Sequence, residues 1–132
     1  MNYIAIFVGG IIGGIIRYLL TFVIPTPGGF ALDILIINLS GCLALGIFYG
    51  IADLKNIKPW LRNGIATGVI GSYTTFSTFC VGTVSMENHH AFLGLIYAVS
   101  SIVIGPLLAY AGDFCVTFVN TRMLQQFEEE TA

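Results

Sequence analysis

Four long apolar runs, separated by short polar or proline-containing segments, organise this 132-residue chain. A helix needs about 20 apolar residues to cross a hydrocarbon core of about 30 Å, and each run is long enough. The pattern predicts an all-α integral membrane protein that forms a single four-helix transmembrane domain over residues 1–132. The helices are expected at 3–24, 32–52, 60–85 and 91–118, followed by a polar tail at 119–132.

The segments between the runs contain helix breakers or charge. Pro25 and Pro27, with Gly28 and Gly29, end the first run. A charged loop precedes Pro59, and the hydrophilic tetrad at 87–90 is expected to close the third helix. The tail is expected to form a short interfacial helix or to fray, with its acidic run at 128–130 in solvent.

The third run contains the most unusual segment, the sequence GVIGSYTTFSTF at 68–79. So many hydroxyls and glycines are hard to reconcile with a continuous helix facing lipid, and they predict a break in mid-membrane. Non-helical backbone at that depth must be buried in protein or line a polar cavity. Its freed carbonyls would form a natural cation site, as in other broken helices.

Composition agrees with a membrane protein. Hydrophobic residues make up 56% of the chain, charged residues only 9%, and the mean hydropathy is +0.89, whereas about a quarter of the residues in soluble proteins are charged. The first run lacks the basic start of a signal peptide and is interrupted by Arg17. The three cysteines, Cys42, Cys80 and Cys115, fall within predicted spans and are expected to be packing residues.

Basic residues in the short loops predict the topology. Lys55, Lys58, Arg62 and Arg122 would all lie on one side of a four-helix protein, and the opposite loops contain no lysine or arginine. The positive-inside rule then places both termini in the cytoplasm. Arg17, inside the first helix, weakens this bias without cancelling it.

Two residues are costly to bury in a bilayer, and each admits two interpretations. Arg17 can anchor the helix at the interface beside Tyr18, or it can line an anion vestibule. Asn38 can hold two helices together through its amide, or it can present a hydrogen-bond donor to a permeating anion.

Phe76 and Phe79 are three residues apart, so a helix would place both rings on one face. Such rings can simply pack in a core or against lipid. Alternatively, their positive edges can solvate a small anion. A conducting path needs binding strong enough to replace hydration and weak enough to allow release, and ring edges, amides and hydroxyls suit that requirement better than full charges.

Together these motifs resemble the Fluc family of fluoride channels, also called the CrcB family. The resemblance covers nearly the whole chain. It rests on GGIIGGIIRY at 9–18, INLSG at 37–41 and above all GSYTTFSTF at 71–79.

The resemblance implies an antiparallel dual-topology dimer in the cell membrane, with two narrow pores between the subunits. By the same resemblance, Phe76, Phe79 and Asn38 would line the fluoride path and Arg17 would lie in the vestibule. The carbonyls of Gly71 and Thr74 would help hold a structural sodium ion at the dimer interface. Tyr97 and Ser101 resemble the start of a polar track, which relatives continue where this chain has Gly105, and Ile34 stands where relatives often have threonine.

The function expected is therefore passive, fluoride-selective export for fluoride resistance, with no enzymatic activity. The biased loop charges leave two assemblies open, a homodimer or one subunit of a heterodimer, and the complete pore motifs favour the homodimer.

A small proton-coupled exporter would need a carboxylate inside the membrane, and Asp33, Asp53 and Asp113 all lie near predicted helix ends. A scaffold subunit would leave the hydroxyl run and paired phenylalanines without a role. His89 and His90 are expected in solvent, and a net charge of −2 without a basic stripe argues against nucleic-acid binding.

Overall fold

The protein is a bundle of helices, three of which are suited to a membrane. The computed structural model describes residues 2–27 and 30–131, with the side chains of 86–91 and 127–131 left out. Over these residues it contains no β-strand. The stretches Asn2–Val23, Leu32–Leu54 and Phe92–Gln126 are long and apolar enough to cross a bilayer. The prediction of an all-α, multi-pass membrane protein is therefore confirmed.

The first two helices end near the predicted breakers. Helix α1 covers Asn2–Val23 and stops shortly before Pro25, whose ring cannot continue a helix. Helix α2 covers Leu32–Leu54. The turn after it includes Asn56, which has a φ of 48°, a left-handed conformation that asparagine tolerates better than most residues. The Gly28-Gly29 pair lies outside the described residues.

The third predicted run folds as several consecutive pieces. Helix α3 (Pro59–Asn63) starts with proline, which suits the first turn because its missing N–H would have no helical partner there. It continues as the π-helix η2 (Gly64–Ile70) and the short α4 (Gly71–Tyr73). Residues 74–76 are not helical, and α5 then covers Ser77–Thr131. Thus the helical backbone is interrupted inside the hydroxyl-rich segment.

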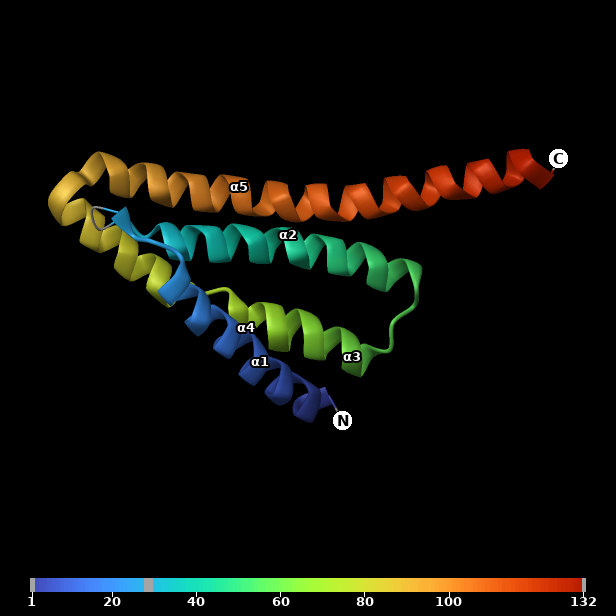
Figure 1. Cartoon of the computed structure of the whole chain (residues 1–132), viewed down its shortest axis with the longest axis horizontal. Helices are drawn as coiled ribbons and strands as arrows, with labels where there is room; N and C mark the ends of the chain where they lie inside the picture. The colour runs from blue at the N-terminus through green and yellow to red at the C-terminus, as the bar shows by residue number, and fades with distance from the viewer. Residues whose placement is uncertain (1, 28–29, 132) are drawn as a thin grey trace.

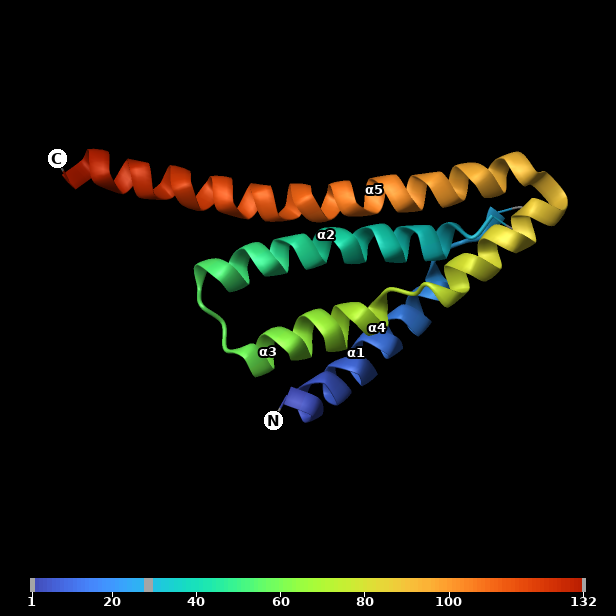
Figure 2. The ribbon, with the colours of Figure 1, turned by 180° about the vertical axis from the view of Figure 1, so that it is seen from behind.

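The structure differs from the sequence expectation at residues 86–90. The hydrophilic tetrad was expected to end the third helix, yet α5 remains helical through it. The reason is that residues 86–90 include neither glycine nor proline, the strongest helix breakers. The chain reverses direction by a sharp bend of α5 where its colour passes from yellow to orange (Figures 1 and 2). The side chains of His89 and His90, like those of the acidic run, lie outside the described residues.

The helices lie in a fixed order across the molecule. The second half of α5 lies beside α2, then come η2 and α4, and α1 crosses beyond them (Figures 1 and 2). Helix α2 and this half of α5 run in the same direction, and α5 projects well past the end of α2. The tail expected at 119–132 is thus helical through Thr131.

Glycines allow these helices to approach closely. A Cβ at Gly9 or Gly13 of α1 would overlap the backbone carbonyls of Gly64 and Val69 in η2. On the other side of the molecule, a Cβ at Gly46 of α2 would overlap the carbonyl of Ala109 in α5. These are backbone-to-backbone contacts of the kind that small residues permit between membrane helices.

An ion pair and a cation–π contact join α2 to α3 at one end of the bundle. Arg62 Nη1 lies 2.9 Å from Asp53 Oδ1, and the Arg62 guanidinium lies 4.8 Å from the centre of the Tyr49 ring. Both side chains of the ion pair are more than a third exposed, so its contribution to stability is small, about 0–1 kcal/mol. The contact nevertheless links the end of α2 to the start of the following helix.

Candidate functional site

The interruption at residues 74–76 removes the helical N–H donors of two backbone carbonyls. Thr74 N–H makes the last helical bond, to Ile70 O at 3.0 Å, and Thr74 then turns to extended backbone with ψ of 157°. In a continuous helix, Gly71 O would accept from Thr75 N–H and Thr74 O from Thr78 N–H. Instead, Thr75 N–H donates to Asn38 and Thr78 N–H donates to Thr75 Oγ1. The carbonyls of Gly71 and Thr74 therefore lack those helical N–H donors, although Gly71 O still accepts from Thr74 Oγ1 at 3.5 Å.

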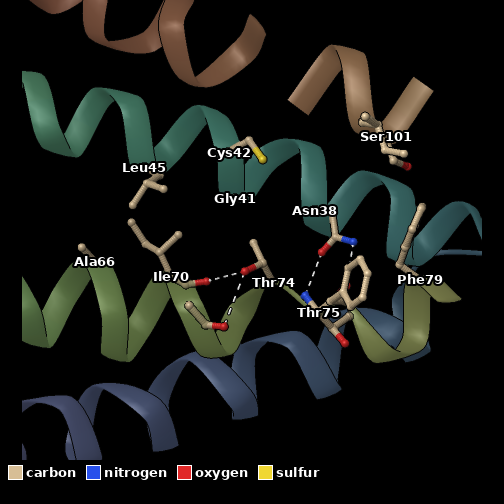
Figure 3. Close-up of a pocket in the computed structure, with 13 residues that line it drawn as sticks. Asn38, Gly41, Cys42, Leu45, Ala66, Ile70, Thr74, Thr75, Phe79 and Ser101 are labelled. Carbon is tan, nitrogen blue, oxygen red and sulfur yellow. Dashed lines mark hydrogen bonds between the residues drawn. The ribbon is translucent and has the colours of Figure 1, made fainter. Parts of the chain in front are cut away.

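Asn38 of α2 holds the interruption in place through two hydrogen bonds. Its Oδ1 accepts from Thr75 N–H at 2.8 Å, and its Nδ2 donates to Thr75 O at 2.9 Å (Figure 3). The Thr75 residue is only 8% exposed, so its backbone groups need partners from within the protein. Each such bond contributes about 0.5–1.5 kcal/mol. One amide N–H of Asn38 is left over from this pairing.

Hydroxyls continue the polar surface around Thr75. Thr75 Oγ1 lies 3.1 Å from Thr78 Oγ1 and 3.3 Å from Ser77 Oγ, and it accepts from Thr78 N–H at 3.3 Å. This last contact joins residues three apart at the start of α5, as an N-cap does. Thr74 Oγ1 donates back to Ile70 O at 3.0 Å and Ser101 Oγ to Tyr97 O at 2.9 Å. Neutral hydroxyls thus surround the interruption.

Aromatic rings extend from the interruption toward α5. The centroids of Phe76 and Phe79 are 5.8 Å apart, and Phe79 stacks on Tyr97 at 5.3 Å. Phe30 meets Tyr97 edge to face at 5.7 Å. Three of these rings differ in exposure, since Phe76 is 77% exposed, Phe79 is half-buried and Tyr97 is fully buried. Tyr97 Oη has no hydrogen-bond partner within the described residues.

Beside the interruption lies a pocket of about 440 Å³ between α2, η2, α4 and α5 (Figure 3). It is mostly apolar with a few converging polar groups, as small-ligand sites usually are. Six of the residues that the sequence analysis singled out line it: Asn38, Gly71, Thr74, Phe76, Phe79 and Ser101.

Two of the expected site residues lie elsewhere. Tyr97 packs behind Phe79 without lining the pocket. Arg17 is half-buried on α1, does not line the pocket, and makes no ion pair within the part of the chain that the structure describes.

Two residues that lie at the centre of the site, Thr75 and Cys42, were not predicted from the sequence. Thr75 is the residue that Asn38 binds, and it was one of several hydroxyl residues with nothing to distinguish it. Cys42 lines the pocket one turn after Asn38 on α2. A spacing of four residues from Asn38 was the available signal, yet Cys42 was predicted only as a packing residue.

Comparison with known proteins shows the family. A family model described as "CrcB-like protein, Camphor Resistance (CrcB)" matches residues 4–113. The chain belongs to the CrcB family. The resemblance inferred from the motifs is therefore confirmed, and the match includes α1, α2, the interruption and the part of α5 beside α2.

Relatives with curated names agree. The chain is 44% identical over 115 residues to "Fluoride-specific ion channel FluC 1" of Staphylococcus aureus (strain NCTC 8325 / PS 47), covering 85% of this chain and 93% of that protein. It is 42% identical over 115 residues to a "FluC 2" of Staphylococcus saprophyticus, with the same coverage. A "FluC 2" of Geobacillus kaustophilus is 37% identical over 116 residues, covering 85% of this chain and 90% of that protein.

Proposed function

We propose that this CrcB-family protein is a fluoride-selective, passive ion channel of the cell membrane that exports fluoride from the cytoplasm and so provides fluoride resistance. The names of its relatives and the family match support the ion. On this proposal the protein is a channel and has no enzymatic activity.

The observation that carries the proposal is the pairing of Asn38 with Thr75. It holds a non-helical segment against a pocket that is lined by an amide, hydroxyl-bearing residues and phenylalanine rings. Neutral donors and positive ring edges replace hydration without the deep trap that a lysine or arginine would create. None of the pocket-lining residues is charged, which suits an anion that must also leave.

A structural sodium ion at the dimer interface belongs to the proposal. Sodium is a hard cation for which carbonyl oxygens are suitable ligands. The residues present fit it, because the carbonyls of Gly71 and Thr74 have lost their helical donors. These two carbonyls would hold the ion, which would supply a fixed positive charge near the anion path.

We further propose an antiparallel dual-topology dimer with two pores between its subunits. Phe76 borders the pocket and yet is 77% exposed, so a second chain is expected to cover its ring and complete the pore wall. A broken third membrane pass, built from α3, η2, α4 and the start of α5, would place this wall in mid-membrane.

A heterodimer is the alternative assembly. Lys55, Lys58 and Arg62 follow α2. Arg122 lies six residues after Val116, which packs against Gly50 near the end of α2, so all four basic residues lie toward one end of the molecule. This charge distribution favours one orientation, and some relatives carry the numbers 1 and 2 in their names. A paralogous partner would then insert the other way.

Ion efflux from liposomes that contain only this purified chain tests the proposal. The liposomes are loaded in parallel with fluoride or chloride, and ion-selective electrodes follow the external ions. We expect rapid fluoride loss with negligible chloride loss. Equal loss of both ions would contradict fluoride selectivity. No flux from folded protein would point to the heterodimer if a second subunit restored it, and would reject the channel if none did.

A further inference from the structure

The second halves of α2 and α5 form a regular seam. Three α2–α5 pairs with the same sequence offset face each other, namely Cys42 with Gly105, Gly46 with Ala109, and Gly50 with Asp113. Asn38 and Ser101 have this offset too, and both line the pocket. The seam therefore consists of successive levels, each four residues or about 6 Å from the next.

Each level has a different chemistry. The level of Asn38 and Ser101 is polar on both helices. At the next level α5 has only Gly105, and a Cβ placed there would lie 3.2 Å from Cys42 Sγ. At the third level Gly46 contacts the backbone of Ala109 directly, which closes the seam. Cys42 therefore provides the last polar side chain before the two helices meet.

The Cys42 thiol is also a donor without an acceptor. Within the described part of the chain it makes no hydrogen bond, although it is half-buried and lines the pocket. By contrast, Thr74 and Ser101, which line the same pocket, already donate their hydroxyl protons to backbone carbonyls. A thiol is a weak S–H donor, so it can contact a permeating anion without trapping it.

We propose that Cys42 is an anion-contacting residue of the pocket, whose thiol supplies the donor that α5 lacks at the level of Gly105. This inference rests on the proposed channel function.

Substitutions at Cys42 test this role by fluoride efflux from liposomes. Cys42→Ser keeps a donor, whereas Cys42→Val removes it and retains an apolar side chain. We expect the serine variant to conduct faster than the valine variant. The valine variant should lose several-fold to about tenfold, the scale of one hydrogen bond. Equal fluxes of folded serine and valine variants would overturn the proposal.

Thiol modification supplies a readout that does not depend on flux. Methyl methanethiosulfonate reacts with the thiolate, forming a mixed disulfide and releasing methanesulfinate. In a Cys80→Ser/Cys115→Ser variant we expect intact mass to show labelling of Cys42, together with loss of fluoride flux. The matched control is Cys42→Ser, which keeps Cys80 and Cys115, neither of which lines the pocket. Its flux should survive the reagent.

The two readouts separate the possible failures. If the wild-type protein conducts fluoride but labelled Cys42 does not reduce the flux, the role of Cys42 is rejected and the channel stands. If the wild-type protein carries no fluoride and no second subunit restores the flux, the proposed function fails. In that case the labelling still tests whether Cys42 faces a water-accessible pocket. If Cys42 stays unlabelled, its placement in such a pocket is wrong as well.

Discussion

The residues that line the pocket are all uncharged. Asn38 uses both ends of its amide on the backbone of Thr75, so the interpretation of Asn38 as a structural clamp and its interpretation as a pore residue are not exclusive. The same side chain binds the interruption and lines the pocket. A change at this residue is therefore expected to affect stability and conduction together.

Asn38→Asp tests the clamp. The carboxylate would keep the bond from Thr75 N–H but would place an oxygen 2.9 Å from Thr75 O, where Nδ2 now donates. We expect a loss of about 1–3 kcal/mol of stability and reduced fluoride flux, measured by thermal unfolding in detergent and by liposome efflux. Asn56→Asp, in the turn after α2, is the control and should change neither. Normal conductance with residue 38 ionised would count against a pore role.

Phe76→Ile and Phe79→Ile test the rings. Isoleucine keeps apolar bulk but lacks the positive edge of the phenyl ring. We expect fluoride flux to fall by about tenfold or more, equivalent to about 1.4 kcal/mol, with folding retained. Phe7→Ile on α1, at a residue that is 68% exposed and lies away from the pocket, should conduct normally. Unchanged flux in a folded Phe76/Phe79 double variant would remove the rings from the mechanism.

At the scale of elements, glycines decide which helices touch. Glycines of α1 fit against η2, and Gly46 and Gly112 fit α2 against α5. The π-helix Gly64–Ile70 leads into the short helix α4, which precedes the interruption. π-helices often occur near functional sites, and this one shifts the register of the backbone that leads to Gly71.

Gly46→Ala tests the seam between α2 and α5. The added methyl would overlap the carbonyl of Ala109, so the helices must separate, at a cost of about 1–3 kcal/mol. We expect a lower midpoint of thermal unfolding. Gly14→Ala is a matched control because a Cβ there meets nothing within 4 Å. Its effect should be neutral or stabilising by up to about 1 kcal/mol. Equal midpoints for the two variants would contradict the close contact.

At the scale of the whole molecule, the single chain exposes a large apolar surface, and Phe76 at the edge of the pocket is part of it. Among the residues whose side chains the structure describes, Ile37 and Tyr97 are the two large, fully buried ones, while most apolar residues of α1 and α5 are exposed. Lipid accounts for much of this surface. A second chain is expected over Phe76, and its orientation is the open question.

Cysteine accessibility tests the orientation. In a variant without native cysteines, Lys58→Cys is labelled on intact cells with an impermeant maleimide. A dual-topology homodimer should present about half of its copies outside, because both orientations insert. A subunit with one orientation should show no external labelling at residue 58 and full labelling of Thr26→Cys at the opposite end. In the homodimer, the Thr26→Cys variant should also be labelled in about half of the copies.

The sequence by itself determined that the protein is an all-α membrane protein of the CrcB family. Apolar length and scarce charge decide membrane insertion, and the motifs at 37–41 and 71–79 are local. Five of the pocket residues were predicted from these motifs, whereas Ser101 lies outside both of them; the five are Asn38, Gly71, Thr74, Phe76 and Phe79. The helical course through 86–90 was not foreseen, because polarity predicts exposure to solvent more directly than it predicts a break in a helix.

Only the tertiary structure decided which residues meet. The pairing of Asn38 with Thr75 and the contact of Cys42 with Gly105 join segments far apart in sequence. Both depend on the relative position of α2 against its neighbours, which is set by close backbone packing at glycines. In the sequence, Arg17 and Asn38 were both costly to bury in a bilayer and both were candidates for the anion path. Of the two, only Asn38 lines the pocket. Periodicity within one helix cannot supply this information, because the register between helices is determined by packing across their surfaces.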